Sequence, residues 1–284
     1  MSSVGIKIVP PHAEFITPKY WPEWAENGPK LIEECGRVSH KSENRITDDS
    51  AEPFIRKIAL KYGHESIIEH INFTACLVGS RSMSHQLVRH RIAAFTQESQ
   101  RYCDYSSDGD ETKLLSVIMP LSIIRSNALW GHTLVRDGDY LLVDGKTILK
   151  AWLDEREIDP LFVELWCRDK LRAYESYLYW TAQGIPPEDA RYDLPNACKT
   201  EVYTTFNLRE WRHVLGVRTE KHAQWEIRLI MCQVHDFLTE HVPFLFKDIQ
   251  PHTEDFELYL SDPFEEDVDA LEVEDPDGST SLRA

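Results

Sequence analysis

Apolar residues recur with a helical period in several segments of the chain. Together with end signals such as Gly63, Gly184 and Pro195, this spacing predicts helices over residues 48–63, 80–92, 167–184, 186–195, 207–218 and 222–238. In the last segment one apolar stripe is formed by Ile227, Ile230, Met231, Val234 and Leu238. We expect this stripe to face the core.

Strand patterns are fewer. Alternating apolar residues predict a half-buried strand over 71–78, and Asp144-Gly145 joins two β-prone runs in a hairpin over 139–150. Helices outnumber strands, and no βαβ rhythm appears. The predicted fold class is therefore α+β, with mixed helices around a small antiparallel sheet.

Composition favours a globular protein. The chain has 284 residues, of which 42% are hydrophobic, and a formal net charge of −17. Its apolar runs fall short of the roughly 18–20 residues of a membrane span, and its N-terminus does not resemble a secretory signal. We expect a cytoplasmic protein that binds neither membrane nor nucleic acid, the latter because an acidic protein repels a polyanion. Residues 263–284 hold eight acidic residues and one arginine, which predicts a disordered tail.

Several common kinds of site are not signalled. The chain contains neither G-x-G-x-x-G nor a P-loop motif, so a nucleotide would have to bind in another architecture. The six cysteines show no zinc-ligand spacing, and only Cys103 is considered for chemistry. The segment 64–70 holds two histidines and two glutamates but does not match H-E-x-x-H, so we predict no metal.

One basic cluster stands out against the acidic background. Arg89, His90, Arg91 and Arg101 lie within thirteen residues, opposed only by Glu98. If residues 80–92 are helical, Gln86, Arg89 and His90 share a face that suits a phosphate and the edge of a base. A solvated helix face with a few ion pairs is the alternative. A second cationic face is predicted at Arg209 and His213, four residues apart.

The cluster also carries a family resemblance. The stretch RHRIAAFTQESQRY resembles the signature of the flavin-dependent thymidylate synthases, with Ala94 and Thr96 departing from its usual residues. GHESIIEHINFT, ARYDLPNACKTEVYTTFNLREWRHVLGVR and TEKHAQWEIR resemble further family segments, in order, from about residue 63 to 228. Against this pattern, residues 106–171 look like an insertion in a single domain over 1–262.

The resemblance implies a set of site residues. Deoxyuridylate (dUMP) would be held by Gln86, Arg89, Gln97, Ser99, Gln100, Arg101, Arg191 and Arg218. FAD would be lined by Ser66, Glu69, Arg89, His90, Arg91, Gln97, Asn207, Arg209 and His213. Arg218 would be catalytic, lying against the pyrimidine and favouring its ionisation. The family is a homotetramer with active sites shared between subunits.

The implied reaction is a reductive methylation of dUMP to dTMP by a methyltransferase without a cysteine nucleophile. In this family 5,10-methylenetetrahydrofolate supplies the carbon and NADPH reduces the FAD. Two alternatives stay open. One is a related enzyme that acts on deoxycytidylate or leaves a hydroxymethyl group, and the other is a non-enzymatic phosphate- or RNA-binding module.

Overall fold

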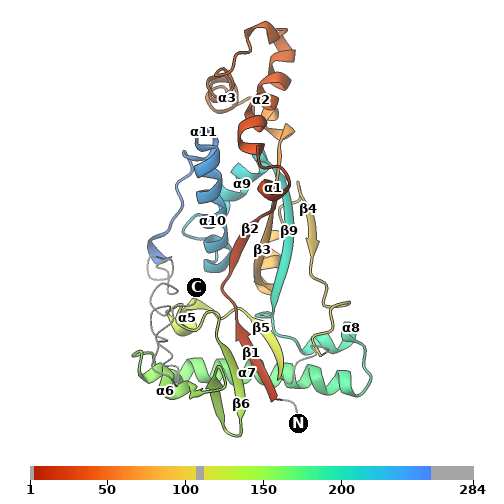
Figure 1. Cartoon of the computed structure of the whole chain (residues 1–284), viewed down its shortest axis with the longest axis vertical. Helices are drawn as coiled ribbons and strands as arrows, with labels where there is room; N and C mark the ends of the chain where they lie inside the picture. Colours follow the sequence, from red (N-terminus) through yellow and green to blue (C-terminus); the bar gives the residue numbers. More distant parts are fainter. Residues whose placement is uncertain (1–2, 107–111, 257–284) are drawn as a thin grey trace, which may run out of the picture.

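A computed structural model describes residues 3–106 and 112–256 of the chain. Two β-sheets, each with its own apolar core, are arranged along the long axis of the molecule (Figure 1). The described N-terminal residues contribute to both sheets, first through β1 and then through β2. A mixed α/β architecture of this kind confirms the predicted fold class.

The first sheet has four strands in the order β2-β3-β9-β4, and every neighbouring pair is antiparallel. Its strands are β2 (His12–Phe15), β3 (Asn72–Ser80), β9 (Lys199–Asn207) and β4 (Ala94–Gln97). Around it lie helices α1 (Ile16–Tyr20), α2 (Trp24–Arg37), α3 (Ala51–Ile55), α4 (Arg81–Leu87), α9 (Leu208–Arg218), α10 (Trp225–His241) and α11 (Pro243–Phe246). Short 3-10 turns η1 (Val38–His40), η2 (Glu43–Arg45) and η4 (Glu65–His70) complete this half.

The apolar patterns explain how this core forms. Phe73, Ala75 and Leu77 alternate along β3 and are fully buried, while the predicted stripe of α10 packs into the same core. The predicted strand and the core-facing stripe of α10 are therefore confirmed, but the strand is not half-buried as predicted. The other face of β3 is also covered, since Cys76 and Val78 are buried, so the strand is more than half-buried.

The second sheet has five strands in the order β5-β1-β6-β7-β8. They are β5 (Thr112–Val117), β1 (Ser3–Ile8), β6 (Thr133–Asp137), β7 (Tyr140–Val143) and β8 (Thr147–Ile148). Helices α5 (Leu121–Ile124), α6 (Leu149–Asp154) and α7 (Pro160–Ala182) belong to this half. Along the chain, α7 is followed by α8 (Pro187–Ala190) and the 3-10 turn η5 (Arg191–Asp193). The last described element is a 3-10 turn, η6 (Glu254–Phe256). The predicted hairpin is confirmed, with Asp144 and Gly145 at φ 50° and 69°.

Two details correct the sequence-based expectations. Strands β1 and β5 pair in parallel, so this sheet is mixed rather than purely antiparallel. The helix predicted over 80–92 ends at Leu87, so Arg89 and His90 do not continue its face. Instead the backbone turns, and the His90 amide donates to the Leu87 carbonyl at 3.1 Å.

A π-helical segment, η3 (Arg56–Lys61), continues directly from α3. The two elements together fill the predicted helix, and Gly63 ends it at φ +72°. The acidic tail predicted over 263–284 lies outside the described residues. Within the described parts of the chain, no helix combines the length and apolar character needed to cross a membrane.

Candidate functional site

Helix α9 presents one polar face to a pocket. Asn207 caps the helix, because its side-chain oxygen accepts from the Glu210 amide at 2.8 Å. Arg209 and His213 follow one turn apart, while Trp211, Val214 and Leu215 on the other side are fully buried. This α9 pocket has a volume of about 600 Å³ and is lined by Glu65, Glu69, Ile92, Asn207, Arg209, Glu210, Arg212 and His213. The face predicted from the sequence therefore does line a cavity.

Two carboxylates from η4 face Arg209 across this pocket. The Arg209 guanidinium donates to Glu65 at 3.2 Å and to Glu69 at 2.5 Å. The hydrogen bond with Glu69 raises the pKa of Arg209 further. The pocket thus offers a ligand both acceptors and cationic donors.

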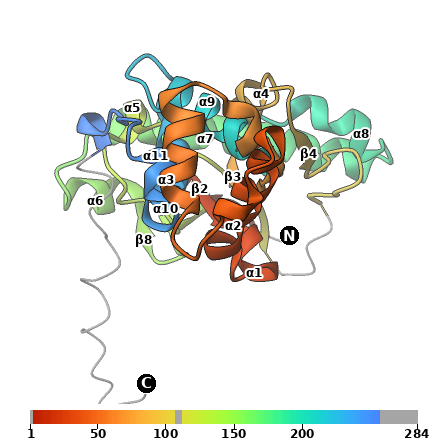
Figure 2. The ribbon, with the colours of Figure 1, turned by 90° about the horizontal axis from the view of Figure 1, so that it is seen from above.

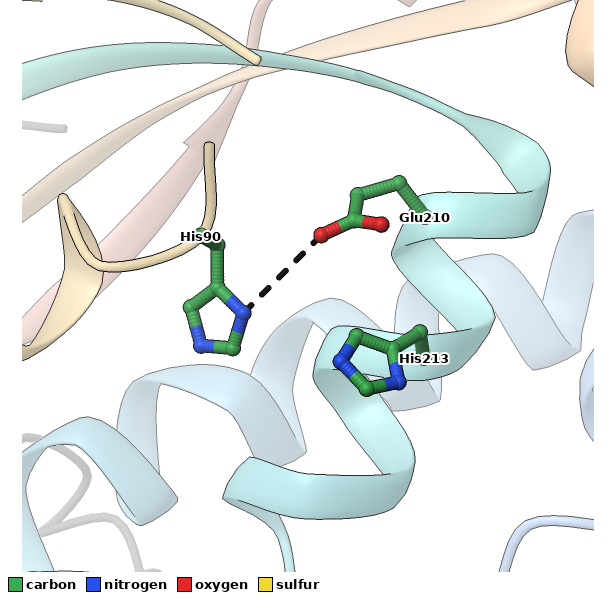
Figure 3. Close-up of side chains that lie close together, drawn as sticks. All are labelled: His90, Glu210 and His213. Atoms are coloured by element: carbon green, nitrogen blue, oxygen red, sulfur yellow. Dashed lines mark ion pairs between the residues drawn. The ribbon is translucent and has the colours of Figure 1, made fainter. Parts of the chain in front are cut away.

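His90 lies beside the same helix, close to Glu210 and His213 (Figure 3). Its Nδ1 atom is 3.9 Å from a Glu210 oxygen, and the two imidazole rings meet edge to face with centroids 6.0 Å apart. Burial, followed by the charges of Arg218 and His213, lowers the pKa of His90 to about 4. His90 is therefore neutral at physiological pH.

Arg218 is fixed by two acceptors. Its Nε–H donates to His90 Nε2 at 2.9 Å, and its Nη2 donates to the Gln86 carbonyl at 3.2 Å. Burial lowers the pKa of Arg218, although a guanidinium stays charged in proteins. Since Nε2 of His90 must accept, the proton of this neutral ring is assigned to Nδ1, on the side of Glu210.

Two imidazoles and a carboxylate would also suit a metal such as zinc, and one ligand atom from each of His90, Glu210 and His213 lies within 4.8 Å of the others. A cation there would stand close to the Arg218 guanidinium, which is bonded to the same imidazole. That repulsion favours an anionic or neutral ligand over a metal. The expectation of no metal stays a prediction.

A second group of predicted residues gathers near α8. The Arg101 guanidinium forms an ion pair with Glu188, whose backbone carbonyl accepts from Arg191 Nε at 2.9 Å. Ser99 Oγ accepts from the Arg101 amide at 3.3 Å. Glu188 thereby joins two arginines that come from distant parts of the sequence.

The remaining predicted residues are placed as follows. Gln97 lies on β4 and donates to Thr200 at 3.1 Å, and Gln100 hydrogen-bonds the thiol of Cys198. Arg89 and Arg91 are exposed. Ser66 lines a second, larger pocket. Among the described residues, no hydrogen bond or ion pair joins the group around Arg218 to the group around Arg101.

Sequence reasoning missed three participants. Glu210 lies three residues after the Asn207 cap of α9. A glutamate is common in the first turn of a helix, so its position in the sequence does not indicate a role in the site. Glu188 meets Arg101 across 87 positions, and Gln224 accepts from Gln86 across 138. A short-range pattern carries no signal for such contacts, although GHESIIEH did place Glu65 beside Glu69.

The chain is similar to known proteins in sequence and in fold. The family model described as "Thymidylate synthase complementing protein" matches residues 22–244. Similar proteins include the flavin-dependent thymidylate synthase of Pyrococcus furiosus, 35% identical over 70% of this chain and 66% of that protein. That of Geobacter sulfurreducens is 32% identical over 73% of both chains. The chain thus spans about two thirds of the length of the Pyrococcus furiosus relative.

Solved structures share the fold. The UMP/dUMP methylase PolB from Streptomyces cacaoi, bound with 5-Br dUMP, is 22% identical with a TM-score of 0.60, covering 85% of this chain and 95% of that one. Thymidylate synthase X from Helicobacter pylori with FAD and dUMP is 17% identical with a TM-score of 0.55, covering 85% of this chain and all (100%) of that one.

Proposed function

The chain belongs to the flavin-dependent thymidylate synthase family, and from this premise we propose that it methylates dUMP reductively to dTMP. The carbon donor would be 5,10-methylenetetrahydrofolate, and FAD reduced by NADPH would supply the hydride. One observation carries the proposal within this chain. Arg218, the predicted catalytic residue, donates hydrogen bonds to neutral His90 and to the Gln86 carbonyl, at the end of the helix that lines the α9 pocket.

The α9 pocket has the chemistry to hold part of FAD. Arg209 and His213 can donate to the pyrophosphate, and Glu65 and Glu69 can accept from sugar or ribityl hydroxyls. Both Nη atoms of Arg212 are already bonded to Asp248. Phosphate binding would compete with the carboxylates for Arg209. Bound FAD would supply the redox chemistry, which no side chain here provides.

Arg218 would act on the pyrimidine by electrostatics. A guanidinium held by two acceptors keeps its orientation, and its charge would stabilise negative charge that develops on the ring at N3 and the neighbouring carbonyl. Because Arg218 is partly buried, this interaction is screened less than one at the surface.

The cysteines support a reaction without a thiolate nucleophile. Burial raises the pKa of the Cys76 and Cys198 thiols to about 11 and that of Cys232 to about 12, and it raises the pKa of Cys167 as well. Thiols with raised pKa values are poor nucleophiles at neutral pH. Cys103 is exposed and makes no side-chain hydrogen bond to a described base.

The group near α8 would bind the phosphate of dUMP. Ser99, Arg101 and Arg191 offer a hydroxyl and two guanidinium groups, the combination that phosphate binds best. Glu188 forms an ion pair with Arg101 in this structure, and the phosphate would have to displace its carboxylate.

We further propose a homotetramer whose active sites are shared between subunits. The two groups of site residues are not bonded to one another within the described chain, and a neighbouring subunit could bring them together. Residues 1–262 would act as one domain, because β1 belongs to one sheet and β2 to the other. A β-bridge between Val117 and Cys198 also connects the two halves. The cytoplasmic location stays a prediction.

The visible absorption spectrum tests the cofactor assignment. The purified protein should show a flavin band, and anaerobic NADPH should bleach it. A protein that retains no flavin after FAD is added and excess removed would contradict the proposal, leaving only a phosphate site.

Subunit mixing tests the shared site. Arg218→Ala and Arg101→Ala tetramers should each be nearly inactive, since each lacks one half of every site. After dissociation and reassociation in equal amounts, about a quarter of the sites should carry both arginines and recover activity. No recovery, in mixed tetramers verified by mass, would mean that each site lies within one subunit.

A further inference from the structure

The segment that follows β4 forms a loop whose two ends are bonded to each other. This 98–105 loop runs towards α8, which lies on the same side of the molecule as β4 in Figures 1 and 2. At its start the Glu98 amide donates to the Glu201 carbonyl of β9 at 2.9 Å. At its end the Tyr105 hydroxyl donates back to Glu98 Oε1 at 2.8 Å. Three of the residues predicted to hold dUMP lie between these two ends.

The carboxylate that closes the loop is neutralised by a lysine. Lys199 Nζ lies 3.2 Å from Glu98 Oε2, and it also pairs with Glu201. The side chains of Glu98 and Lys199 are 18% and 21% exposed, so their interaction is screened less than one at the surface. Both oxygens of the Glu98 carboxylate are therefore bonded within the protein.

Helix α7 holds the far end of the loop through two tyrosines one turn apart. The Tyr177 hydroxyl donates to Asp104 Oδ1 at 3.1 Å and accepts from the Tyr105 amide at 3.2 Å. The Tyr174 hydroxyl donates to the Tyr105 carbonyl at 2.7 Å. Tyr174 and Tyr177 are fully buried. Tyr105 is thus bonded at its amide, its carbonyl and its hydroxyl.

The directions of these hydrogen bonds follow from the chemistry of the groups. Burial raises the pKa of Tyr177 to about 12 and raises the pKa of Tyr105 as well, so both hydroxyls are protonated at neutral pH. A carboxylate only accepts, so the single Tyr177 proton goes to Asp104 and its oxygen receives the Tyr105 amide. Removal of this one hydroxyl would break both contacts.

The same turn of α7 also contacts the other segment of the predicted phosphate site. The Ser176 hydroxyl donates to Asp193 at 2.5 Å. Asp193 is the last residue of η5, and Arg191 is the first. One helical turn, residues 174–177, therefore contacts both segments that carry the predicted phosphate ligands.

We propose that Tyr177 is a positioning residue for nucleotide binding. Its hydroxyl holds the 98–105 loop in the conformation that presents Ser99 and Arg101 to the nucleotide phosphate. The proposal rests on the proposed function, which takes this group as the phosphate site of dUMP. It also gives α7, which begins within the predicted insertion, a part in substrate binding.

A positioning role predicts a change in affinity without a change in chemistry. If the loop holds the binding conformation for only part of the time, the apparent Kd rises in proportion. In Tyr177→Phe, which keeps the buried ring, calorimetric titration of the FAD-loaded protein should give a Kd for dUMP about ten-fold higher. The kcat at saturating dUMP and the flavin bound per protein should stay at their wild-type values.

Tyr179→Phe is the matched control, because it removes the same hydroxyl from the same helix. Tyr179 is 58% exposed, and its hydroxyl forms no hydrogen bond with a described residue. This variant should bind dUMP as the wild type does. An unchanged Kd in Tyr177→Phe would overturn the proposal. A loss of kcat or of bound flavin as large as the rise in Kd would do so too, because it would indicate a general role in stability.

A double-mutant cycle tests whether Tyr177 acts through the loop. In an Arg101→Ala background, Tyr177→Phe should raise the Kd for dUMP by a smaller factor, since one of the groups that it positions is missing. An undiminished factor would contradict action through the loop.

Tyr105→Phe tests the loop independently of α7. It breaks the bond to Glu98 and leaves the backbone contacts with α7 in place, and it should also raise the Kd for dUMP. If Tyr177→Phe does not fold, this variant decides, and wild-type affinity in it would overturn the proposal.

Failure of this proposal is distinguishable from failure of the proposed function. If the wild-type protein binds dUMP and Tyr177→Phe binds it equally well, only the positioning role is wrong. If the wild-type protein does not bind dUMP, the proposed function itself is wrong.

Discussion

Replacement of His90 should weaken catalysis through Arg218. His90 accepts from the Arg218 Nε–H at 2.9 Å, and with a pKa of about 4 only about one ring in a thousand is protonated at pH 7. His90→Leu removes the acceptor and leaves the guanidinium held only through the Gln86 carbonyl. A hydrogen bond to a charged group contributes about 1.5–3 kcal/mol. We therefore expect kcat to fall about 10- to 100-fold.

His90→Gln separates this effect from loss of flavin contact. Both variants lack the imidazole that is predicted to touch FAD, but glutamine offers an amide oxygen that can accept from Arg218. FAD should be added to saturation, and the flavin bound per protein should be checked by its absorbance. Under these conditions, kcat of His90→Gln should exceed that of His90→Leu. Equal values for the two variants, or wild-type turnover in His90→Leu, would refute the role of this hydrogen bond.

Four further outcomes are expected. Arg218→Ala should keep FAD, by its visible spectrum, and lose at least about 100-fold in turnover, since it removes the charge aimed at the pyrimidine. The pKa of His90 is lowered to about 4 in the native chain, so between about pH 6.5 and 4 the unfolded chain binds a proton that the native chain does not. The free energy of unfolding should therefore fall by up to about 3 kcal/mol as the pH drops through this range. Urea unfolding of His90→Gln should show less of this fall. Ser80→Ala should cost about 1–2 kcal/mol in urea unfolding, because Ser80 caps α4 at the Met83 amide and donates to buried Glu226 at 2.7 Å. Cys103→Ala should retain dTMP formation, and a folded but inactive variant would reopen nucleophilic catalysis by this thiol.

The sequence predicted the site best where chemistry follows a regular period. Arg209 and His213 share the pocket face of α9 because four residues make about one helical turn. The same reasoning was wrong for Gln86, Arg89 and His90, since α4 ends at Leu87. His90 still reaches Arg218, 128 positions away, through tertiary packing that no local pattern encodes.

Long-range pairing also limited the fold prediction. Hydrophobic alternation identified β3, and Asp144-Gly145 identified the hairpin, because both signals lie within a few residues. The parallel pairing of Ser3 with Thr112 joins segments more than a hundred positions apart. The strands β5, β6, β7 and β8, which lie in the predicted insertion, thus share one sheet with the N-terminal strand β1.

The mass of the nucleotide product tests the central claim most directly. The protein should be incubated with FAD, NADPH, 5,10-methylenetetrahydrofolate and dUMP, with deoxycytidylate in a parallel reaction. Formation of dTMP from dUMP, dependent on each component and absent with deoxycytidylate, is the predicted result. Unchanged dUMP, a 5-hydroxymethyl product, or methylation of deoxycytidylate instead would contradict the account.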